Sequence, residues 1–344
     1  MTIEPFSYAL PDEQIAQRPV YPPESAKMLV VDRATNQLYH RSFADIAALL
    51  RPTDRLVFND TRVIPARFYP RLDSESGTQV ELVLLREVAT NEWTAIGYPM
   101  RRIRGAQQLL FGDDLRAIQL PSDRPDRIRI KFQTPSRQRT LQLIESLGSM
   151  PIPPYIRKGR ADEQDRLDYQ SIFAEHAGSV AAPTASLHFS EGLVDTIRSS
   201  VGCSIDTVTL HVGAASFQPV LVNGELRPPG AEEFHVPDAL VQSLLEAKAA
   251  GNRVIAVGTT VVRALESAAR ARGDSSTGET ELFIQPGSNF ALVDALVTNF
   301  HQSGTTHLLL VEALLGRELL SRAYESALSE RYRFLSYGDG MFIL

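Results

Sequence analysis

The 344-residue chain contains one cysteine, one tryptophan and no long apolar run. The single cysteine, Cys203, excludes an internal disulfide and a cysteine zinc cluster, and its setting VGCSIDTVTL predicts a small core residue at the start of a strand. No segment approaches the roughly 18 consecutive apolar residues of a membrane helix, and residues 1–19 have neither a basic leader nor an apolar stretch. We expect an untargeted protein of the reducing cytoplasm that does not contact membranes.

Positive charge is also in short supply, because 35 Lys and Arg face 41 Asp and Glu, which gives a net charge of −6. This balance argues against indiscriminate binding to nucleic acid, so any RNA contact must be local. The length exceeds what one ordinary domain needs, and two domains are expected.

The pattern of the chain changes between its first half and its second. The segments TQVELVLL, EWTAIGY and RIRIKF have the composition of strands, which predicts a small all-β domain inserted at residues 63–149. The stretch MPIPPYIR marks its boundary, because prolines end a helix and stiffen a connector. Residues 1–62 and 150–344 are expected to form an α/β main domain with a mostly parallel sheet.

Helices and strands alternate beyond this boundary, and this rhythm predicts the α/β layers. The expected elements are a helix around 165–176, a strand at 206–212, a helix at 236–251, a strand at 253–257 and a helix at 261–270. Ligands gather at the carboxyl ends of strands in open α/β sheets, so the turns after these strands are the places to look for a site.

The segment RVIAVGTTVVRALES is the clearest such turn. Its apolar strand ends at Gly258, Thr259 and Thr260, and a helix with Arg263 and Glu266 follows. Free backbone N–H groups and the positive end of the helix suit a carboxylate or a phosphate. By the motif alone, however, ordinary N-capping by a threonine explains it better.

Two further segments share this layout. DTVTLHVGAASF places His211 near a strand end, where a lone histidine is more often a hydrogen-bonded core residue. VDALVTNFHQSGTTH places Asn299 and His301 between a strand and a Gly-Thr-Thr helix start. Repetition of this layout favours a pocket lined by backbone amides, threonines and histidines. The tail RYRFLSYGDG adds another polar turn with Tyr337 and Asp339.

The stretch GSVAAPTASLHFS, residues 178–190, combines small side chains with one imidazole, His188. Side chains this small fit either close packing of backbone in a core or close approach of backbone to a ligand. Gly178, Ser179 and Thr184 are the residues that a ligand would meet under the second interpretation.

Basic side chains gather in the expected β-domain. RIRIKF alternates, so Arg127, Arg129 and Lys131 share one exposed face, and Arg101, Arg102 and Arg104 could extend it. A strip that follows the phosphates of an RNA and a plain solvated face of a strand explain this pattern about equally well.

Seven segments together resemble a known family in order and along nearly the whole chain. They are LVFNDTRVIPAR, MPIPPYI, GSVAAPTASLHF, TLHVGAASFQPV, RVIAVGTTVVRALES, DALVTNFH and YRFLSYGD. The family is the S-adenosylmethionine:tRNA ribosyltransferase-isomerase family of queuosine biosynthesis. The resemblance implies an inserted domain that is barrel-like.

The resemblance also implies a reaction. The ribosyl part of S-adenosylmethionine is transferred and rearranged onto an aminomethyl-deazaguanine at the wobble position of a tRNA with a GUN-type anticodon. Adenine and methionine leave, and an epoxycyclopentanediol nucleoside, epoxyqueuosine, results. S-adenosylmethionine serves as co-substrate, no metal is expected, and the enzyme is expected to be a monomer or a weak homo-oligomer.

The chain departs from the family pattern at several loops. LRPPGAEEFHVP replaces a His-x-Met-His-x-Glu segment, so that both histidines are lost and Glu232 takes the acidic place. NFHQSGTTH replaces Asn-Phe-His-Leu-Pro-x-Ser-Thr, and Gly-Thr-Phe becomes Ala215 to Phe217. These changes leave two alternatives open: a paralogue that acts on a free deazapurine or another nucleoside, and a non-catalytic RNA-binding relative.

The resulting site hypothesis has three groups of residues. The catalytic acid or base is sought among His188, His211 and His301. The co-substrate is expected to contact Gly178, Ser179, Thr184, Gly258, Thr259, Thr260, Arg263, Asn299, Tyr337 and Asp339, with Arg263 paired either with the methionine carboxylate or with Glu266. RNA is expected to contact Arg62, Arg101, Arg102, Arg104, Arg127, Arg129 and Lys131.

Overall fold

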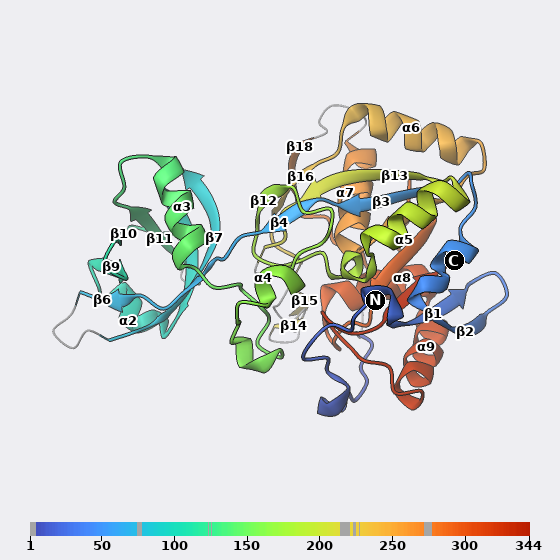
Figure 1. The fold of residues 1–344 in the computed structure, drawn as a ribbon, viewed down its shortest axis with the longest axis horizontal. Coiled ribbons are helices and arrows are strands. Elements are labelled where there is room, and N and C mark those ends of the chain that lie inside the picture. Colours follow the sequence, from blue (N-terminus) through green and yellow to red (C-terminus); the bar gives the residue numbers. More distant parts are fainter. Residues whose placement is uncertain are drawn as a thin grey trace.

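Two β-sheets lie apart in the computed structural model of the chain, one large and one small (Figure 1). The structure describes residues 5–73, 78–122, 124, 126–213, 221–222, 225–226, 228–271 and 277–344. Within these ranges, no helix combines the length and the apolar character that crossing a bilayer requires.

Nine strands form the large sheet in the described part of the chain. Their order across the sheet is β18 (Thr277–Thr280), β16 (Glu232–His235), β13 (Ser204–Leu210), β3 (Arg55–Asn59), β17 (Val254–Val257), β19 (Ala295–Asn299), β20 (Gly340–Ile343), β1 (Lys27–Asp32) and β2 (Gln37–Ser42). Strands β13, β3, β17 and β19 are parallel to their neighbours within this group, and β20 is parallel to β1. The other neighbours are antiparallel.

The large sheet is therefore mixed, and the expected mostly parallel sheet is not confirmed. The parallel strands form its centre, where helical crossovers connect them. The antiparallel pairs arise at the two ends of the sheet, where β1 and β2 form a hairpin and the C-terminal strand β20 inserts between β19 and β1.

Helices cover both faces of the large sheet because its central strands are apolar on both sides. In β3, Val57 belongs to one core and Leu56 and Phe58 to the other. The first core is closed by α6 (Asp238–Ala249), α7 (Thr259–Arg270), α8 (Thr306–Leu315) and α9 (Arg317–Ser329). The second is closed by α1 (Ile46–Leu49) and α5 (Glu191–Thr196), and the buried Cys203 lies in it directly before β13, as the sequence predicts.

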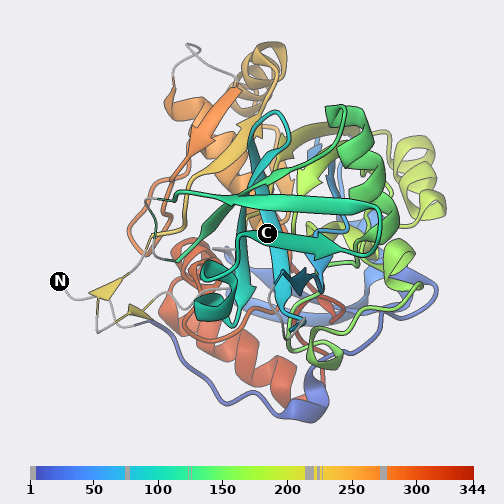
Figure 2. The ribbon, with the colours of Figure 1, turned by 90° about the vertical axis from the view of Figure 1, so that its left-hand side faces the viewer.

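The small sheet is antiparallel throughout and curls into a half-barrel. Its order is β5 (Arg67–Phe68), β7 (Glu81–Ala89), β8 (Glu92–Tyr98), β11 (Ile128–Phe132), β10 (Leu115–Leu120), β9 (Gln108–Phe111) and β6 (Arg71–Leu72). Strands β5 and β6 are separated by residues 69 and 70 alone, yet they form opposite edges, so the sheet has to curl until those edges approach. Helix α3 (Arg137–Leu147) packs on it through Leu143 and Ile144, and Figure 2 looks onto this sheet with α3 at its upper right.

The chain enters and leaves the small sheet at a single crossing point. The backbone N–H of Arg67 donates to the carbonyl of Ser149 at 3.1 Å, and the N–H of Ser149 donates to the carbonyl of Arg67 at 2.8 Å. Gly148 lies so close that a Cβ atom there would be 1.8 Å from the carbonyl oxygen of Pro65. Only glycine fits at position 148, because the two crossing segments leave no room for a side chain there.

The expected helix around 165–176 is wrong in most of its length. Helix α4 covers only Asp165–Asp168, and His176 begins strand β12 (His176–Ser179), which pairs with β4 (Thr61–Val63). The backbone N–H groups of Glu175 and His176 both donate to the carbonyl of Asp60, which draws this segment into an extended course beside β4.

The remaining elements are short. A helical turn of five residues, α2 (Met100–Arg104), follows β8, and β14 (Leu221–Val222) pairs with β15 (Glu225–Leu226). The helical turns are η1 (Asp12–Gln14), η2 (Pro23–Ser25), η3 (Phe43–Asp45), η4 (Arg157–Gly159), η5 (Thr184–His188) and η6 (Ile197–Val201).

Candidate functional site

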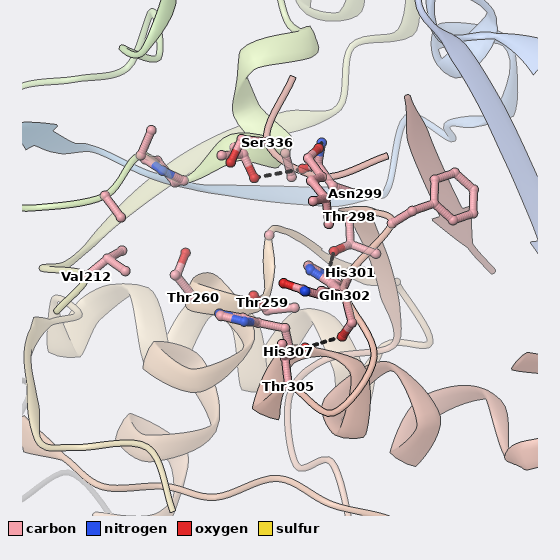
Figure 3. A pocket seen from close by; sticks show the side chains of 18 of the residues that line it. Val212, Thr259, Thr260, Thr298, Asn299, His301, Gln302, Thr305, His307 and Ser336 are labelled. Carbon is pink, nitrogen blue, oxygen red and sulfur yellow. Dashed lines mark hydrogen bonds between the residues drawn. The ribbon is translucent and has the colours of Figure 1, made fainter. Parts of the chain in front are cut away.

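A cavity opens at the carboxyl ends of β17 and β19, with a volume of about 170 Å³ (Figure 3). Its walls come from residues 181–185, 258–260, 298–302 and 335–336, with contributions from Pro154, Tyr155, Tyr169, Val212, Thr305 and His307. The three repeated strand-turn-helix segments therefore do meet at one place, because parallel strands bring their carboxyl ends to the same edge.

The small-residue stretch 178–186 divides into two parts with different roles. Residues 181–185 line the cavity. Gly178 instead faces the ring of His211, and a Cβ atom there would be 2.8 Å from the Cε1 atom of that ring. Ser179 is bound into the backbone, since its hydroxyl donates to the carbonyl of Ala181 at 2.7 Å and accepts from the N–H of Val212 at 2.8 Å. Core packing thus explains Gly178 and Ser179, and Val180 and Ser186 are also buried outside the cavity lining, so only residues 181–185 face the cavity.

Helix α7 points its N-terminus into the cavity. Gly258 precedes it with φ at 101°, a conformation that residues with a side chain rarely adopt. No side chain caps the first turn of α7, and Thr259 and Thr260 line the cavity. The Oγ1 atom of Thr260 accepts a hydrogen bond from the amide of Asn59 at 3.1 Å, which fixes the rotamer of the threonine. The positive end of this helix therefore faces the cavity with polar threonines around it.

Helix α8 begins at the same cavity in a different way. Thr305 is its N-cap, and the Oγ1 atom of Thr305 accepts from the N–H of Leu308 at 3.3 Å. The ring of His307, in the first turn, stacks on the ring of His301 with 5.3 Å between centroids and 20° between planes. In Figure 3 these two rings and Gln302 gather on one side of the cavity, beside Thr259.

The two stacked imidazoles are neutral at pH 7. Burial, together with the positive charge of Arg263, lowers the pKa of His307 to about 4. Burial, with His307 alongside, also holds the pKa of His301 well below its usual range. The Nε2 atom of His301 is hydrogen-bonded to the hydroxyl of Thr298 at 2.8 Å, which leaves Nδ1 as its other proton-carrying position. The cavity therefore has uncharged groups that can accept or donate a proton.

Asn299 lines the cavity but is engaged with protein atoms. Its Oδ1 atom accepts from the hydroxyl of Thr184 at 2.9 Å, and its Nδ2 atom donates to the carbonyl of Leu335 at 3.2 Å. Asn299 thus ties η5 to the turn at residues 335–336. In that turn the hydroxyl of Ser336 bonds to that of Tyr155 at 2.7 Å, so the same wall is held from both sides.

His188 lies outside this cavity. Its ring is buried and stacks on Phe43 at 4.5 Å, and its two nitrogens face the carbonyl oxygens of Ala185 at 3.2 Å and Gly338 at 2.9 Å. Burial lowers its pKa, so the ring is neutral and donates to one of these carbonyls. These contacts join η5 to the C-terminal turn and leave no ring nitrogen facing the cavity.

Arg263 is not among the residues that line the cavity, and its ion-pair partner in the protein is not the expected Glu266. Its guanidinium forms a buried ion pair with Glu232 and donates to the carbonyls of Leu282 and Thr280, both at 3.2 Å. Glu266 is occupied elsewhere, because it accepts the backbone N–H groups of residues 291, 292 and 293 at 2.7 to 3.0 Å. The expected Arg263–Glu266 pair is therefore wrong: Glu266 closes the loop before β19, and Arg263 joins α7 to β16 and β18.

Tyr337 and Asp339 stabilise the C-terminal turn. The hydroxyl of Tyr337 donates to the buried carboxylate of Asp165 at 3.1 Å. Asp339 accepts the backbone N–H groups of Lys27 at 3.0 Å and of Arg333 at 2.7 Å. Neither residue is among those that line the cavity.

Comparison with known proteins now places this arrangement in a family. The family model described as "Queuosine biosynthesis protein" matches residues 3–343. The chain belongs to the queuosine biosynthesis protein family. The resemblance found in the sequence is confirmed.

Individual members of the queuosine biosynthesis family are similar along their full length. The S-adenosylmethionine:tRNA ribosyltransferase-isomerase of Acaryochloris marina is 43% identical over 352 residues, which cover 100% of this chain and 94% of the relative. The enzyme of the same name from Desulforamulus reducens is 39% identical, with 100% of both chains covered. The crystal structure of the S-adenosylmethionine tRNA ribosyltransferase of Thermotoga maritima has a TM-score of 0.55 and 33% identity, and the match covers 98% of this chain and 99% of that one.

His211 lies behind the cavity wall in this member of the family. Its Nδ1 atom bonds to the hydroxyl of Thr61 at 2.8 Å, and burial lowers its pKa. Nearby, the ligand atoms of Asp60, Glu175 and His176 lie within 4.8 Å of one another, which is the geometry of a possible metal site among the described residues. The Nδ1 atom of His176 is 3.3 Å from the Oδ1 atom of Asp60, so a direct contact between these two side chains accounts for the same grouping.

The expected RNA-binding residues separate into two sets. On β11, Arg129 and Lys131 both bind Glu92 of the neighbouring strand, at 3.1 and 3.0 Å, and Arg127 lies 3.5 Å from Asp126. The positive charges of Arg129 and Lys131 hold the pKa of Glu92 below its usual value. Arg62 contacts Glu145 at 3.5 Å, whereas Arg101, Arg102 and Arg104 are exposed on α2.

Several cavity residues were missed in the sequence. They are Tyr155, Tyr169, Thr298, Gln302, Thr305, His307 and Ser336. Gln302, Thr305 and His307 lie in the segment NFHQSGTTH, so the departure from the family pattern was itself a signal. The altered segment Ala215–Phe217 lies outside the described residues.

Proposed function

We propose that this protein transfers the ribosyl part of S-adenosylmethionine onto a tRNA and isomerises it. The acceptor is the aminomethyl-deazaguanine at the wobble position, and the product is epoxyqueuosine with adenine and methionine released. The full-length identity of about 40% to enzymes named for this activity is the observation that carries the proposal. The cavity at the carboxyl ends of β17 and β19 is the site that we assign to it.

S-adenosylmethionine would occupy this cavity with its carboxylate at the start of α7. The positive end of the helix and the hydroxyls of Thr259 and Thr260 stabilise a carboxylate there. Arg263 supports this placement indirectly, because its contacts hold α7 against β16 and β18. Thr184 and Asn299 form the adjoining wall.

A neutral wall suits the sulfonium group of the co-substrate. A positive charge on the stacked imidazoles would repel the sulfonium, and their low pKa values prevent that charge at pH 7. The side chains of Tyr155, Tyr169 and Phe300 give the cavity aromatic surface, which attracts cations.

The reaction requires removal of a proton from the carbon beside the sulfonium, and we assign this step to His301. The positive sulfur acidifies that carbon, so a neutral imidazole can act as the base. Thr298 holds the Nε2 atom of His301 and thereby orients the ring, while Nδ1 remains for the proton. His211 stays a second candidate, although it is not among the residues that line the cavity, whereas its neighbour Val212 is.

The altered loop at Gln302 to His307 bears on one part of the proposal, the identity of the acceptor. A reshaped wall at this position would suit a free deazapurine or another nucleoside instead of a tRNA. We retain tRNA because the small sheet persists, and an enzyme for a free base has little use for it. We further propose a GUN-type anticodon in the tRNA, a cytoplasmic reaction and a monomeric or weakly associated enzyme.

Adenine release from S-adenosylmethionine tests the proposal. Three acceptors are compared: tRNA that carries aminomethyl-deazaguanine, the anticodon stem-loop that carries it, and the free base. We expect release with both RNAs and none with the free base. Turnover with the free base alone would establish the altered-acceptor paralogue, and RNA binding without adenine release would establish the non-catalytic relative. Anticodons other than GUN, placed in the same stem-loop, test the tRNA class, and light scattering tests the oligomeric state.

A further inference from the structure

The short helix α2 carries three exposed arginines at one end of the small sheet. Arg101 and Arg102 are both exposed, and among the described residues neither has a carboxylate within 4.0 Å. Two adjacent arginines repel each other and gain nothing for folding without such a partner. The paired residues of β11 differ in this respect, since Arg129 and Lys131 both contact Glu92, which offsets one of their two charges.

The backbone around α2 forces these arginines outward. Ile103 is fully buried in the core of the small sheet and anchors the turn. It lies directly on Gly97, where a Cβ atom would be 2.3 Å from the Cδ1 atom of Ile103 and 2.7 Å from the carbonyl oxygen of Glu81. Glycine is therefore required at 97 for the turn to lie on β8. With Ile103 inside, the residues on either side of it face solvent.

An exposed aromatic residue comes shortly before the two arginines in the chain. Tyr98, the last residue of β8, is 76% exposed, which is the highest value among the large apolar side chains that the structure describes. A single exposed tyrosine is unremarkable by itself. An exposed ring and two exposed arginines within one five-residue segment form a combination that suits unpaired nucleotides, because such a ring can stack on a base while the arginines contact phosphates.

We propose that the segment Tyr98–Arg104 is a contact site for the tRNA substrate. Tyr98 stacks on an unpaired base, and Arg101 and Arg102 bind neighbouring phosphates. The inference rests on the proposed function, because the acceptor has to be an RNA. Figure 1 places α2 at the lower end of the small sheet, away from the large sheet that carries the cavity, so one RNA molecule would be held at two separate points. The acidic net charge makes such a local contact necessary.

Binding of modified tRNA, measured by fluorescence anisotropy over a range of salt concentrations, tests the inference. The double variant Arg101→Ala/Arg102→Ala is compared with Arg129→Ala/Lys131→Ala, which removes the same charge from the paired strand. We expect the first variant to bind more weakly and to lower the slope of log K against log salt by about 1.4, since each contact to single-stranded RNA contributes about 0.7. The second variant should lose less affinity and lower the slope by at most about 0.7, because Glu92 already offsets one of its two charges.

The stacking of Tyr98 on a base is tested separately from the charge of Arg101 and Arg102. We expect Tyr98→Ala to weaken tRNA binding by about 5- to 100-fold, the value of one stacked base, with no change in the salt slope. Tyr98→Phe keeps the ring and should bind like the parent. Both variants should keep the parental KM for S-adenosylmethionine and the parental kcat at saturating tRNA, because the cavity is untouched.

The outcomes separate this inference from the proposed function. If the parent releases adenine with modified tRNA but the variants at 98, 101 and 102 bind it as tightly and with the same salt slope, this inference is overturned and the proposed function stands. Equal losses in the two double variants would also overturn it, since they would indicate diffuse attraction. If the parent releases no adenine with any RNA acceptor, the proposed function fails and this inference fails with it.

Discussion

The tripeptide Gly-Thr-Thr occurs twice at the cavity and begins two helices in two different ways. At residues 258–260 the glycine is the N-cap, and both threonines lie inside α7 without a capping side chain. At residues 304–306 the first threonine is the N-cap of α8 and satisfies the N–H of Leu308. A shift of one residue in the helix start therefore decides whether the hydroxyl of the first threonine caps its own helix.

The difference assigns separate tasks to the two helix starts. The start of α7 has an open first turn and suits the anionic end of a ligand. The start of α8 is closed by its own cap, and what it offers to the cavity is the imidazole pair of His301 and His307. We expect binding to fail when the first start is altered, and chemistry to fail when the second is.

The largest effect is expected for His301. His301→Gln should lower turnover by about 10²- to 10⁴-fold, the usual contribution of a general base, and should bind S-adenosylmethionine almost as well as the parent. The matched control is His188→Gln, which removes a buried ring without touching the cavity and should lower the melting temperature while sparing turnover. Full turnover by His301→Gln would assign that residue to structure instead.

The second-largest effect is expected at Gly258 in the start of α7, compared with Gly304 in the start of α8. Gly258→Ala forces a side chain into φ of 101°, which costs about 1–3 kcal/mol, and we expect about 10- to 100-fold weaker binding of S-adenosylmethionine by calorimetry. Gly304→Ala is the control, because its φ of 69° is a left-handed conformation with nothing within 4 Å of the added Cβ atom. It should cost about 1 kcal/mol of stability and leave affinity unchanged. Equal losses of affinity would refute the distinction.

Substitution of the threonines should have smaller effects, on binding for Thr260 and on stability for Thr305. Thr260→Val removes a hydroxyl that faces the cavity and should weaken co-substrate binding about fivefold, the value of one hydrogen bond of about 1 kcal/mol. Thr305→Ala removes the cap of α8 and should lower the free energy of unfolding by about 1 kcal/mol with affinity kept within twofold. If the two variants exchange these phenotypes in calorimetry and urea unfolding, the assignment of the two helix starts is wrong.

The smallest effect is a dependence on pH. The pKa of His307 is lowered to about 4, so its folded form stays neutral at pH 7 and gains a proton only in acid. At pH 4 about half of the molecules carry that charge beside the sulfonium, which should weaken S-adenosylmethionine binding about twofold relative to pH 6. His307→Gln should lose this dependence. A twofold loss that persists in His307→Gln would locate the titrating group elsewhere.

Local patterns in the sequence were sufficient for the parts of the fold that depend on neighbours along the chain. Alternation in RIRIKF gave the buried face of Ile128, Ile130 and Phe132 correctly, because a strand presents every second residue to the same side. The helix after Gly258 was predicted from its apolar spacing and observed at Thr259–Arg270. The strand-to-helix turns also pointed to the edge of the sheet at which the cavity lies.

Contacts between segments that are far apart in the sequence could not be predicted from these local patterns. The partner of Arg263 is Glu232 on another strand, and no spacing distinguishes it from Glu266 one helical turn away. Gly178 was attributed to a ligand, although the ring of His211 is the group that excludes a side chain there. The C-terminal strand β20 was not predicted at all, and its antiparallel pairing with β19 depends on the whole fold.

The crossing of the chain at Arg67 and Ser149 has a genetic consequence. The two residues are held as a hydrogen-bonded pair of opposed strands, so a link of a residue or two would rejoin the chain if everything between them were lost. Recombination could therefore add, exchange or delete the small sheet in one event without leaving a gap that the rest of the molecule has to span. A gene built in this way can acquire a new module at this position while the coding sequence for its cavity stays untouched.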